Sequence, residues 1–235
     1  MNDKFIEFKN VYKKYPYDGG EIVALNDINF TIKEGELVIV LGDSGAGKST
    51  ALNILGGMDS LTSGEVIVDN NVISKMRDDE LTDYRKTDIG FVFQFYNLIP
   101  NLTVQENVEL ASKLSKNPMD AVELLKTVGL GERLNNFPGQ ISGGEQQRAS
   151  IARAIAKNPK ILLCDEPTGA LDYKTGKLIL SLLQEINKKY NKTVIIITHN
   201  SLIKGIADRV ITFKSGKILD VSINDNPSRI EDLEW

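Results

Sequence analysis

The stretch ELVIVLGDSGAGKST, residues 36–50, predicts more of the fold than any other part of the chain. Its first six residues are rich in β-formers and read as a buried strand, and STALNILGG, residues 49–57, suits a helix. Between them, GDSGAGKS (residues 42–49) matches the pattern GxxxxGKS, with the flanking strand and helix that this pattern requires. We therefore expect a glycine-rich phosphate-binding loop between a strand and a helix.

The chemistry of such a loop follows from its residue types. Glycines let backbone N–H groups turn toward a phosphate, and the helix that follows adds about half a positive charge at its N-terminus. Lys48 can bridge the outer phosphates, and the Ser49 hydroxyl can ligate Mg²⁺. Asp43 would repel a phosphate, so its carboxylate is expected to point away from the loop. The residues expected to bind the phosphates are Gly42, Asp43, Ser44, Gly45, Ala46, Gly47, Lys48, Ser49 and Thr50.

The rest of the chain alternates between strand-like and helix-like patterns. Strands are expected at residues 5–11, 28–32, 36–41, 64–69, 89–94, 160–166 and 193–199, with a closing pair at 209–213 and 217–221. Helices are expected at about 103–128 and at 178–190. This alternation is typical of an α/β fold whose largely parallel sheet is covered on both faces. The helical middle of the chain reads as an insertion into that plan.

Length and composition limit the classes of protein to consider. The 235 residues suffice for one large α/β domain, and 41% hydrophobic with 26% charged residues is ordinary for a globular protein. The net charge of −4 argues against a general nucleic-acid binder. The single cysteine, Cys164, excludes a disulfide framework and is expected to be buried and unreactive.

The chain is expected to cross no membrane itself, although it could work beside one. Its N-terminal residues are too polar for a signal peptide, and no apolar run approaches the roughly 20 residues that a spanning helix needs. Residues 224–235 read as a surface tail or a short helix.

Polar side chains are expected where three of the predicted strands end. Asp165 and Glu166 close one strand, at the edge where open α/β sheets bind ligands. Because consecutive strand residues face opposite ways, Asp165 can hold Mg²⁺ through water while Glu166 orients or deprotonates an attacking water. His199, the only histidine, can touch the terminal phosphate, and Gln94 can contact Mg²⁺ and the water. The alternative for each is an ordinary polar residue satisfied by hydrogen bonds.

The stretch PGQISGGEQQRASIARAIAKNP, residues 138–159, contains another glycine-rich loop that opens onto a helix. Ser142, Gly143 and Gly144 bring neither a nucleophile with its base nor a metal cluster. The helix N-terminus nevertheless offers a second anion-binding site. It could grip the nucleotide of the same chain or one that another copy holds.

Together these motifs resemble those of the ATP-binding cassette (ABC) ATPases over nearly the whole chain. The stretches at residues 42–49, 161–166 and 141–145 resemble the Walker A motif, the Walker B motif with its catalytic glutamate, and the signature loop usually written LSGGQ. Those at 91–94, 169–172 and 197–199 resemble the Q-loop, the D-loop and the switch histidine. The resemblance implies one P-loop ABC-ATPase domain over 1–235. Its mostly parallel, RecA-like core would carry an N-terminal antiparallel β subdomain and a helical subdomain inserted at about 95–158.

The resemblance also implies a shared nucleotide site. Two copies would pack head to tail, with each ATP between the Walker A loop of one and the signature loop of the other. Ser142, Gly143 and Gly144 would then grip the γ-phosphate of the partner's ATP. Tyr15 falls where the family stacks an aromatic ring on adenine, an interaction of about 1–3 kcal/mol; ordinary strand packing is the alternative. Asp172, in the D-loop, is expected to contact the nucleotide as well.

The chain departs from the family pattern at a few positions. Ile141 and Glu145 stand where the signature has leucine and glutamine, and Asp43 stands where many relatives have proline. Glu145 would bring a carboxylate close to the partner's nucleotide, although glutamate also suits the first turn of a helix. No departure removes a reacting group, so the resemblance still implies an active ATPase that uses ATP and Mg²⁺.

Residues 52–59, 89–110 and 168–176 resemble the MacB and LolD branch of the family, which serves macrolide export, lipoprotein release and peptide-antibiotic resistance. The resemblance implies an ATPase at the cytoplasmic face of the cell membrane. It would energise export or mechanotransmission through an FtsX/MacB-like permease that has few spanning helices and a large extracytoplasmic domain. Residues 95–99 would help receive a cytoplasmic helix of that permease, or would simply pack the helical subdomain. The alternative function is a regulatory ATPase, similar to FtsE, that signals through a membrane partner to cell-wall hydrolases.

Overall fold

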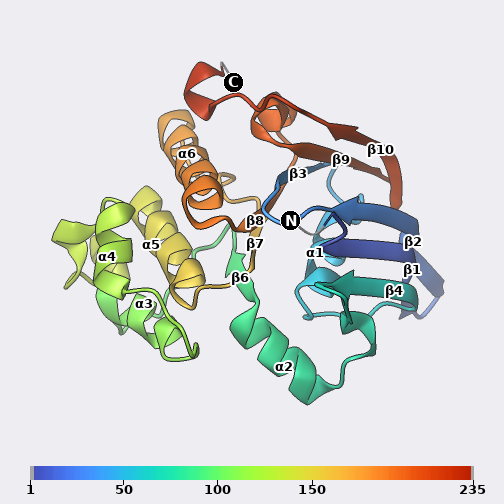
Figure 1. Ribbon diagram of the computed structural model, residues 1–235, viewed down its shortest axis with the longest axis horizontal. Helices are drawn as coiled ribbons and strands as arrows, with labels where there is room; N and C mark the ends of the chain where they lie inside the picture. The colour runs from blue at the N-terminus through green and yellow to red at the C-terminus, as the bar shows by residue number, and fades with distance from the viewer. Residues whose placement is uncertain (1–2, 234–235) are drawn as a thin grey trace.

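The computed structural model describes residues 3–233 and contains two β-sheets flanked by helices (Figure 1). The N-terminal sheet is antiparallel, with the order β2 (Gly20–Ile32), β1 (Ile6–Tyr17), β4 (Ser63–Val68) and β5 (Asn71–Val72). The second sheet has the order β10 (Lys217–Ile223), β9 (Arg209–Lys214), β3 (Leu37–Leu41), β8 (Thr193–Thr198), β7 (Ile161–Asp165) and β6 (Ile89–Val92). Its strands are parallel except for β10 at one edge. The predicted α/β class, with a mostly parallel core and an antiparallel N-terminal part, is confirmed.

Strand β3 shows why the core sheet is buried on both faces. Leu37, Ile39 and Leu41 belong to the apolar cluster that contains α5 (Gly143–Ala156) and α6 (Tyr173–Tyr190). The alternate residues, Val38 and Val40, belong to the cluster on the other face, with α1 (Lys48–Leu55) and the antiparallel sheet. Each fully buried side chain of this kind contributes roughly 1.5–3 kcal/mol, so the all-apolar sequence of β3 favours the centre of a sheet covered on both faces.

The predicted helix at 103–128 is two helices, α3 (Val104–Ser112) and α4 (Ala121–Thr127). The break contains Pro118, which cannot continue a helix, and Asp120 starts the next helix by accepting a hydrogen bond from the Glu123 N–H at 2.8 Å. Both helices pack on α5, away from the antiparallel sheet (Figure 1).

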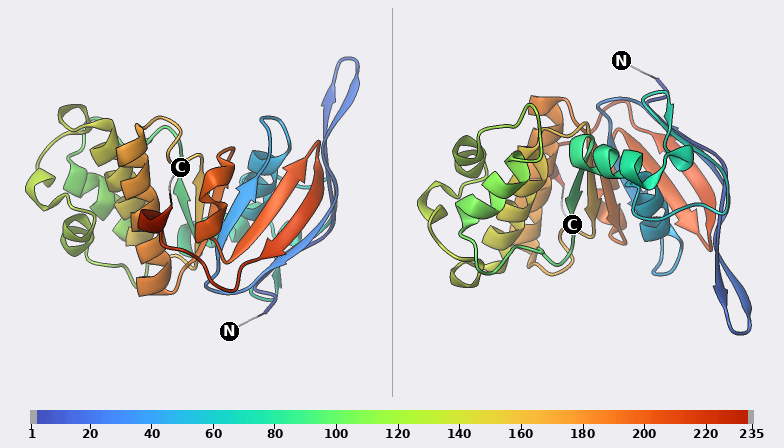
Figure 2. Two further views of the ribbon diagram at one scale, coloured as in Figure 1. Left: turned by 90° about the horizontal axis from the view of Figure 1, so that it is seen from above. Right: turned by 90° about the horizontal axis from the view of Figure 1, so that it is seen from below.

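Two further elements differ from the sequence-based expectations. Helix α2 (Asp78–Thr87) was missed because it is strongly polar and buries only Tyr84. Strands β1 and β2 are longer than predicted and form a hairpin whose turn, drawn in blue, projects from the body of the molecule (Figure 2). The extended part of this hairpin is exposed, so no buried apolar alternation marked it.

The expected strands at 89–94, 160–166 and 193–199 each end earlier than predicted. Strand β6 ends at Val92, so Gln94 lies two residues beyond it. Strand β7 ends at Asp165 because Glu166 takes a left-handed backbone conformation, φ 47°. The side chains of Asp165 and Glu166 are therefore separated by the turn of the backbone at Glu166. The alternation of successive strand residues, which was expected from the sequence to separate them, is not the cause.

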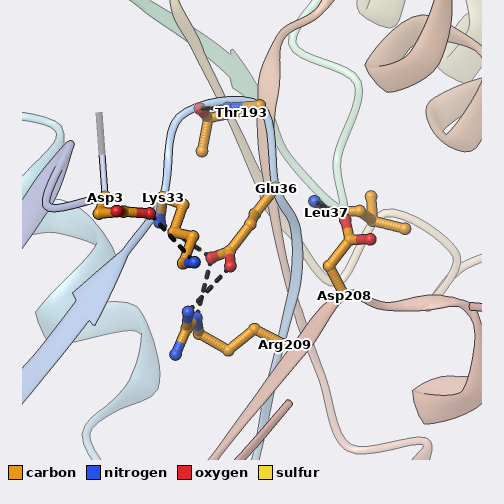
Figure 3. Close-up of polar contacts among 8 residues, drawn as sticks. Asp3, Lys33, Glu36, Leu37, Thr193, Asp208 and Arg209 are labelled. Carbon is orange, nitrogen blue, oxygen red and sulfur yellow. Dashed lines mark hydrogen bonds and ion pairs between the residues drawn. The ribbon is translucent and has the colours of Figure 1, made fainter. Parts of the chain in front are cut away.

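Strands β3 and β9 are joined at their N-terminal ends by an ion pair (Figure 3). The buried side chain of Arg209 donates to both carboxylate oxygens of Glu36, at 2.8 Å each, and Asp208 accepts from the Leu37 N–H at 2.6 Å. This edge is opposite to the one where residues 42, 166 and 199 follow their strands.

The C-terminal segment returns to the helical side and ends in a short 3₁₀ helix, Ile230–Asp232. Ile230 is fully buried, and its N–H donates to the side chain of Gln184 in α6 at 3.3 Å. The stretch expected to be a surface tail or a short helix thus contains a short 3₁₀ helix that packs on α6, and its residues 234–235 lie outside the described residues. Within residues 3–233, no helix is both long and apolar enough to span a bilayer.

Candidate functional site

The glycine-rich loop between β3 and α1 needs glycine at its ends. Gly42 and Gly47 have φ values of 150° and 100°, and a Cβ atom on either would lie 2.5 Å from a backbone carbonyl oxygen, that of Phe213 or Ala24. The loop is thereby pressed against β9 and β2. Such close backbone packing is possible only without side chains, which is a second reason for glycine beside the expected approach of a phosphate.

Lys48 forms the floor of this loop. Its side chain is almost fully buried, and Nζ donates to the carbonyl oxygens of Gly42 at 2.6 Å and Asp43 at 2.9 Å. The ammonium group is therefore held at one place by neutral acceptors. Asp43 itself is exposed, as expected for a carboxylate beside a phosphate site, although it lines the same cleft.

Asp165 faces the start of α1 from the end of β7. Its Oδ1 lies 3.3 Å from the Ser49 hydroxyl, which donates to it. Burial raises the pKa of the Asp165 carboxyl, and the charge of Glu166 acts in the same direction, while the hydrogen bond from Ser49 opposes the rise. The site would therefore favour a cation that compensates the buried carboxylate.

Glu166 and His199 meet across the ends of β7 and β8. His199 Nδ1 lies 2.9 Å from Glu166 Oε1, and the histidine side chain is 72% exposed. The left-handed backbone of Glu166 is held by its N–H, which donates to the Ile197 carbonyl at 3.0 Å, and by its carbonyl, which accepts from Gly169 at 3.0 Å. A carboxylate that orients an imidazole in this way suits the transfer of a proton to or from water.

Gln94 reaches the same region from the loop after β6. A Cβ atom on Gly169 would lie 3.1 Å from Gln94 Nε2, so the side chain lies against the turn that follows Glu166. Both Gln94 and Gly169 line the cleft that also contains Glu166 and His199.

Tyr15 forms part of the opposite wall and is held there by polar contacts. Its hydroxyl donates to Asp59 Oδ2 at 2.6 Å, and Lys13 Nζ lies 4.6 Å from the ring centroid. Lys13 also pairs with Asp59 Oδ1 at 2.6 Å. Burial and then the hydrogen bond to Asp59 raise the pKa of Tyr15. The ring is partly exposed and lines the cleft, which ordinary strand packing would not require.

These residues line one open cleft with a volume of about 950 Å³. Its walls contain the predicted residues Tyr15, Asp43, Ser44, Gly45, Ala46, Gly47, Lys48, Ser49, Thr50, Gln94, Asp165, Glu166 and His199. Nucleotide binding was not expected from the sequence for Ile22, Val23, Ala24, Phe93, Phe95, Asn97, Gly169 and Ile197, which also line it. Residues 22–24 belong to the extended hairpin, where the only sequence signal was the β-branched character of Ile22 and Val23 beside a turn.

The loop of Ser142, Gly143 and Gly144 does not line this cleft. Ser142 caps α5, since its hydroxyl accepts from the Glu145 N–H at 3.3 Å. A Cβ atom on Gly144 would clash with Thr175 Cγ2, so packing within the chain already favours glycine here.

Asp172 also lies outside the cleft. It caps α6 by accepting hydrogen bonds from the Thr175 N–H at 3.1 Å and the Thr175 hydroxyl at 2.6 Å. The structure therefore gathers most predicted site residues in one place and leaves the signature loop and Asp172 apart from them.

Glu145 folds back onto its own chain. Its Oε2 accepts from the Ser142 N–H at 2.8 Å and the Ser142 hydroxyl at 2.9 Å, and Oε1 pairs with Arg133 Nε at 3.0 Å. The Ser142 N–H, then Arg133 and the Ser142 hydroxyl, lower the pKa of Glu145 to about 2. The negative charge of this residue is thus neutralised by local partners.

The donor set near the loop fits Mg²⁺ in part. The Ser49 hydroxyl, the Asp165 carboxylate and the Gln94 amide supply the oxygen atoms that Mg²⁺ prefers. No cluster of three or more metal-ligating His, Cys, Asp or Glu side chains occurs in residues 3–233. The residues present therefore fit an ion that binds mainly through nucleotide phosphates and water.

Comparison with known proteins gives consistent results. The family model described as ABC transporter matches residues 25–169. The chain is 48% identical to the uncharacterised ABC transporter ATP-binding protein MJ0796 of Methanocaldococcus jannaschii over 222 residues, which cover 91% of this chain and 94% of that protein. A structure of MJ0796 as a post-hydrolysis dimer bound to ADP and Pi superimposes with a TM-score of 0.85 at 45% identity, over 93% of this chain and 98% of that one.

Longer relatives contain the same region. A putative ABC transporter ATP-binding protein of Mycoplasma pneumoniae is 43% identical over 236 residues, which cover 99% of this chain but 51% of that protein. The macrolide export ATP-binding/permease protein MacB of Pasteurella multocida is 43% identical over 232 residues, 96% of this chain and 36% of that protein. The chain thus spans about half the length of its Mycoplasma relative.

Proposed function

Because the chain belongs to the ABC transporter family and is an ABC-type ATPase, we propose that it hydrolyses ATP between two copies to energise a membrane partner. The observation that carries the proposal is the separation of two half-sites. The cleft around Lys48 contains a phosphate loop, acids and a histidine, whereas Ser142–Gly144 forms a second helix N-terminus outside it. A second copy packed head to tail would bring the two together.

The cleft orients the nucleotide by its own chemistry. The Tyr15 ring offers a stacking platform for adenine, held by Asp59 and Lys13. The loop from Gly42 to Thr50 receives the phosphates, and Lys48 presents a fixed positive charge to the outer ones. Binding energy from the base and the phosphates therefore places the γ-phosphate near Glu166.

The reacting groups then act on water at the γ-phosphate. Glu166 orients the water and takes its proton, and His199, held at 2.9 Å from that carboxylate, contacts the terminal phosphate. Gln94 contacts the same water from the loop after β6. Ser49, Asp165 and Gln94 would hold Mg²⁺, which neutralises charge on the phosphates.

Closure of the dimer couples binding to turnover. Ser142, Gly143 and Gly144 of one copy contact the γ-phosphate held by the other, and Asp172 lies near the same interface. ATP binds the closed dimer better than the open one, and loss of the γ-phosphate releases it. MJ0796, the relative described above, is dimeric with ADP and Pi bound, which supports this arrangement.

A permease is the partner that best explains the exposed apolar side chains that follow Gln94. Phe95, which is 74% exposed, lines the nucleotide cleft, and Ile99, which is 40% exposed, follows it in the same loop; we take these exposed apolar side chains together as a docking surface. We assign to this surface a cytoplasmic helix of a permease with few spanning segments and a large extracytoplasmic domain, as in MacB-type exporters. The chain would work as a single cassette at the cytoplasmic membrane face, with residues 95–158 as its helical subdomain.

A mixing experiment tests the shared site. Ser142→Arg and Lys48→Ala are each expected to abolish turnover, with monomer ATP binding retained in Ser142→Arg only. In a mixed head-to-tail dimer, one site combines the intact Lys48 loop of one chain with the intact Ser142 loop of the other. Mixing the two inactive proteins should therefore restore ATPase activity. If mixing restores none, or if Ser142→Arg prevents ATP binding by the monomer, the shared site is wrong.

Purification of the native membrane complex tests the partner. Recovery with a MacB-like permease supports transport or mechanotransmission, including antibiotic export. Recovery with an FtsX-like membrane protein and a cell-wall hydrolase would replace it with the regulatory alternative.

A further inference from the structure

Gln147, in the second turn of α5, is a fully buried amide that touches two segments of the proposed active site. Its Nε2 donates to the Pro167 carbonyl at 2.7 Å and to the Phe93 carbonyl at 3.3 Å. Pro167 directly follows Glu166, and Phe93 directly precedes Gln94. One side chain thus holds the backbone beside both residues that are proposed to contact the attacking water.

The orientation of this amide is set mainly by its two donated hydrogen bonds. The buried Ser150 hydroxyl supports it from the other side, since it lies 3.0 Å from Gln147 Oε1 and 2.8 Å from the Gln147 backbone carbonyl oxygen and can donate to either. Rotation of the amide would remove the donor from the buried Pro167 carbonyl, at a cost of about 1–3 kcal/mol, and from the partly buried Phe93 carbonyl. A buried network in which every member is satisfied resists such rearrangement.

Other contacts join the same helix to the Gln94 loop. Arg153, also in α5, donates to the carbonyl oxygens of Tyr96 at 3.0 Å and Asn97 at 2.5 Å. At the helix start, a Cβ atom on Gly143 would lie 2.7 Å from Tyr96 Oη. The segment from Phe93 to Asn97 is therefore joined at several points to α5, whose first residues belong to the signature loop.

We propose that Gln147 is a positioning residue that couples the signature loop to Glu166 and Gln94. When the signature loop closes on a partner's nucleotide, movement of α5 reaches Pro167 and Phe93 through the two hydrogen bonds of this amide. Each site would thus acquire its reactive geometry only when its own chain is engaged by the partner. The inference rests on the proposed roles of Glu166, Gln94 and the shared site.

Gln147→Met tests this coupling, because methionine keeps the size of the side chain but removes both donors. The matched control is Gln184→Met. Gln184 is likewise buried, donates to the Ser228 carbonyl at 2.8 Å and accepts from the Ile230 N–H at 3.3 Å, but it lies between α6 and the C-terminal segment. Both variants lose a buried amide network, so a general loss of stability should affect them alike.

We expect kcat of Gln147→Met to fall by more than about tenfold, since small misplacements of reacting groups have large effects on rate. The affinity of the monomer for ATP should change less than about twofold, because Gln147 does not line the cleft. Gln184→Met should keep its kcat. Ser150→Ala removes the hydroxyl beside the Gln147 amide with little loss of core volume, and it should lower kcat by a smaller factor. This variant keeps the test informative if Gln147→Met folds poorly.

Two results would overturn the coupling. One is a kcat for Gln147→Met and Ser150→Ala equal to that of Gln184→Met; the other is a loss of monomer ATP affinity as large as the loss of kcat. Glu166→Gln and Gln94→Ala, measured in parallel, separate this failure from failure of the proposed function. If those two variants keep full turnover, the proposed site itself is wrong; if they lose it while Gln147→Met does not, only the coupling is wrong.

Discussion

The imidazole of His199 and the carboxylate of Glu166 lie 2.9 Å apart, between Nδ1 and Oε1, although 33 residues separate them in the chain. The contact depends on the left-handed backbone of Glu166, a conformation that costs about 1–3 kcal/mol for a residue with a side chain. That conformation turns the carboxylate out of the line of β7 and toward the residue after β8. Strain of this kind is retained where a site requires it.

Glu166→Gln tests this pair directly. Glutamine keeps the size of the side chain and can still contact His199, but it cannot take a proton from water. We expect turnover to fall by about 10²–10⁴ while ATP binding persists, so that an ATP-bound dimer accumulates. Phosphate release and size-exclusion chromatography with ATP measure the two effects. Glu185→Gln, an exposed change on α6, is the control, and wild-type turnover in Glu166→Gln would remove Glu166 from its role.

The centre of the fold was predictable because its strands are apolar over their whole length. Strands β3, β7 and β8 stand next to one another or one strand apart, and the segments after them contain Lys48, at the start of α1, and Glu166 and His199. Parallel strands place their C-terminal ends at one edge, so the pattern that identified the strands also grouped the site. The polar helix α2 and the exposed part of the β1–β2 hairpin escaped prediction because little of either is buried.

Details of the site depended on contacts that no sequence pattern encodes. The pairing of Tyr15 with Asp59 joins residues 44 positions apart, and the ion pair of Glu145 with Arg133 joins two separate elements. The end of β7 at Asp165 follows from one dihedral angle at Glu166. Local propensity carries no information on these three features.

Tyr15→Ala should weaken ATP binding without slowing the chemical step. Loss of a stacked base is worth about 1–3 kcal/mol, or roughly 5- to 150-fold in KM, while kcat should stay constant because the ring binds substrate and transition state alike. Tyr15→Phe keeps the ring and loses only the hydrogen bond to Asp59, so its KM should rise less. Tyr17→Ala, on the same strand but outside the cleft, is the control. An equal rise of KM in Tyr17→Ala would contradict a stacking role.

Glu145 should make stability sensitive to acid. Its pKa is lowered to about 2 in the folded chain, below the usual value of 4.5, so its contribution is fully present above about pH 4.5 and is lost as the pH falls toward 2. Glu145→Gln keeps a capping acceptor but loses the charge that pairs with Arg133. The difference in free energy of unfolding between wild type and variant should therefore shrink between about pH 5 and pH 3, as urea titrations would measure. A difference that stays constant over this range would show that the pairing does not stabilise the fold.

Lys48→Ala should remove ATP binding while sparing the stability of the nucleotide-free protein. Among residues 3–233, Nζ has only neutral carbonyl oxygens at hydrogen-bond distance. Because the side chain is also nearly buried, the ammonium group gives up much of its hydration without a directly bonded anion from this part of the chain. A bound phosphate supplies that anion, so removal of the Lys48 side chain should affect mainly the stability of the ATP-bound protein.

Lys157→Ala is the matched control. Lys157 is also largely shielded from solvent and donates to a carbonyl, that of Arg85, but it lies outside the cleft. ATP should raise the melting temperature of wild type and of Lys157→Ala by the amount that binding to the folded state dictates, and should leave that of Lys48→Ala unchanged. A full ATP-induced rise in Lys48→Ala would mean that the loop at residues 42–49 does not bind the phosphates.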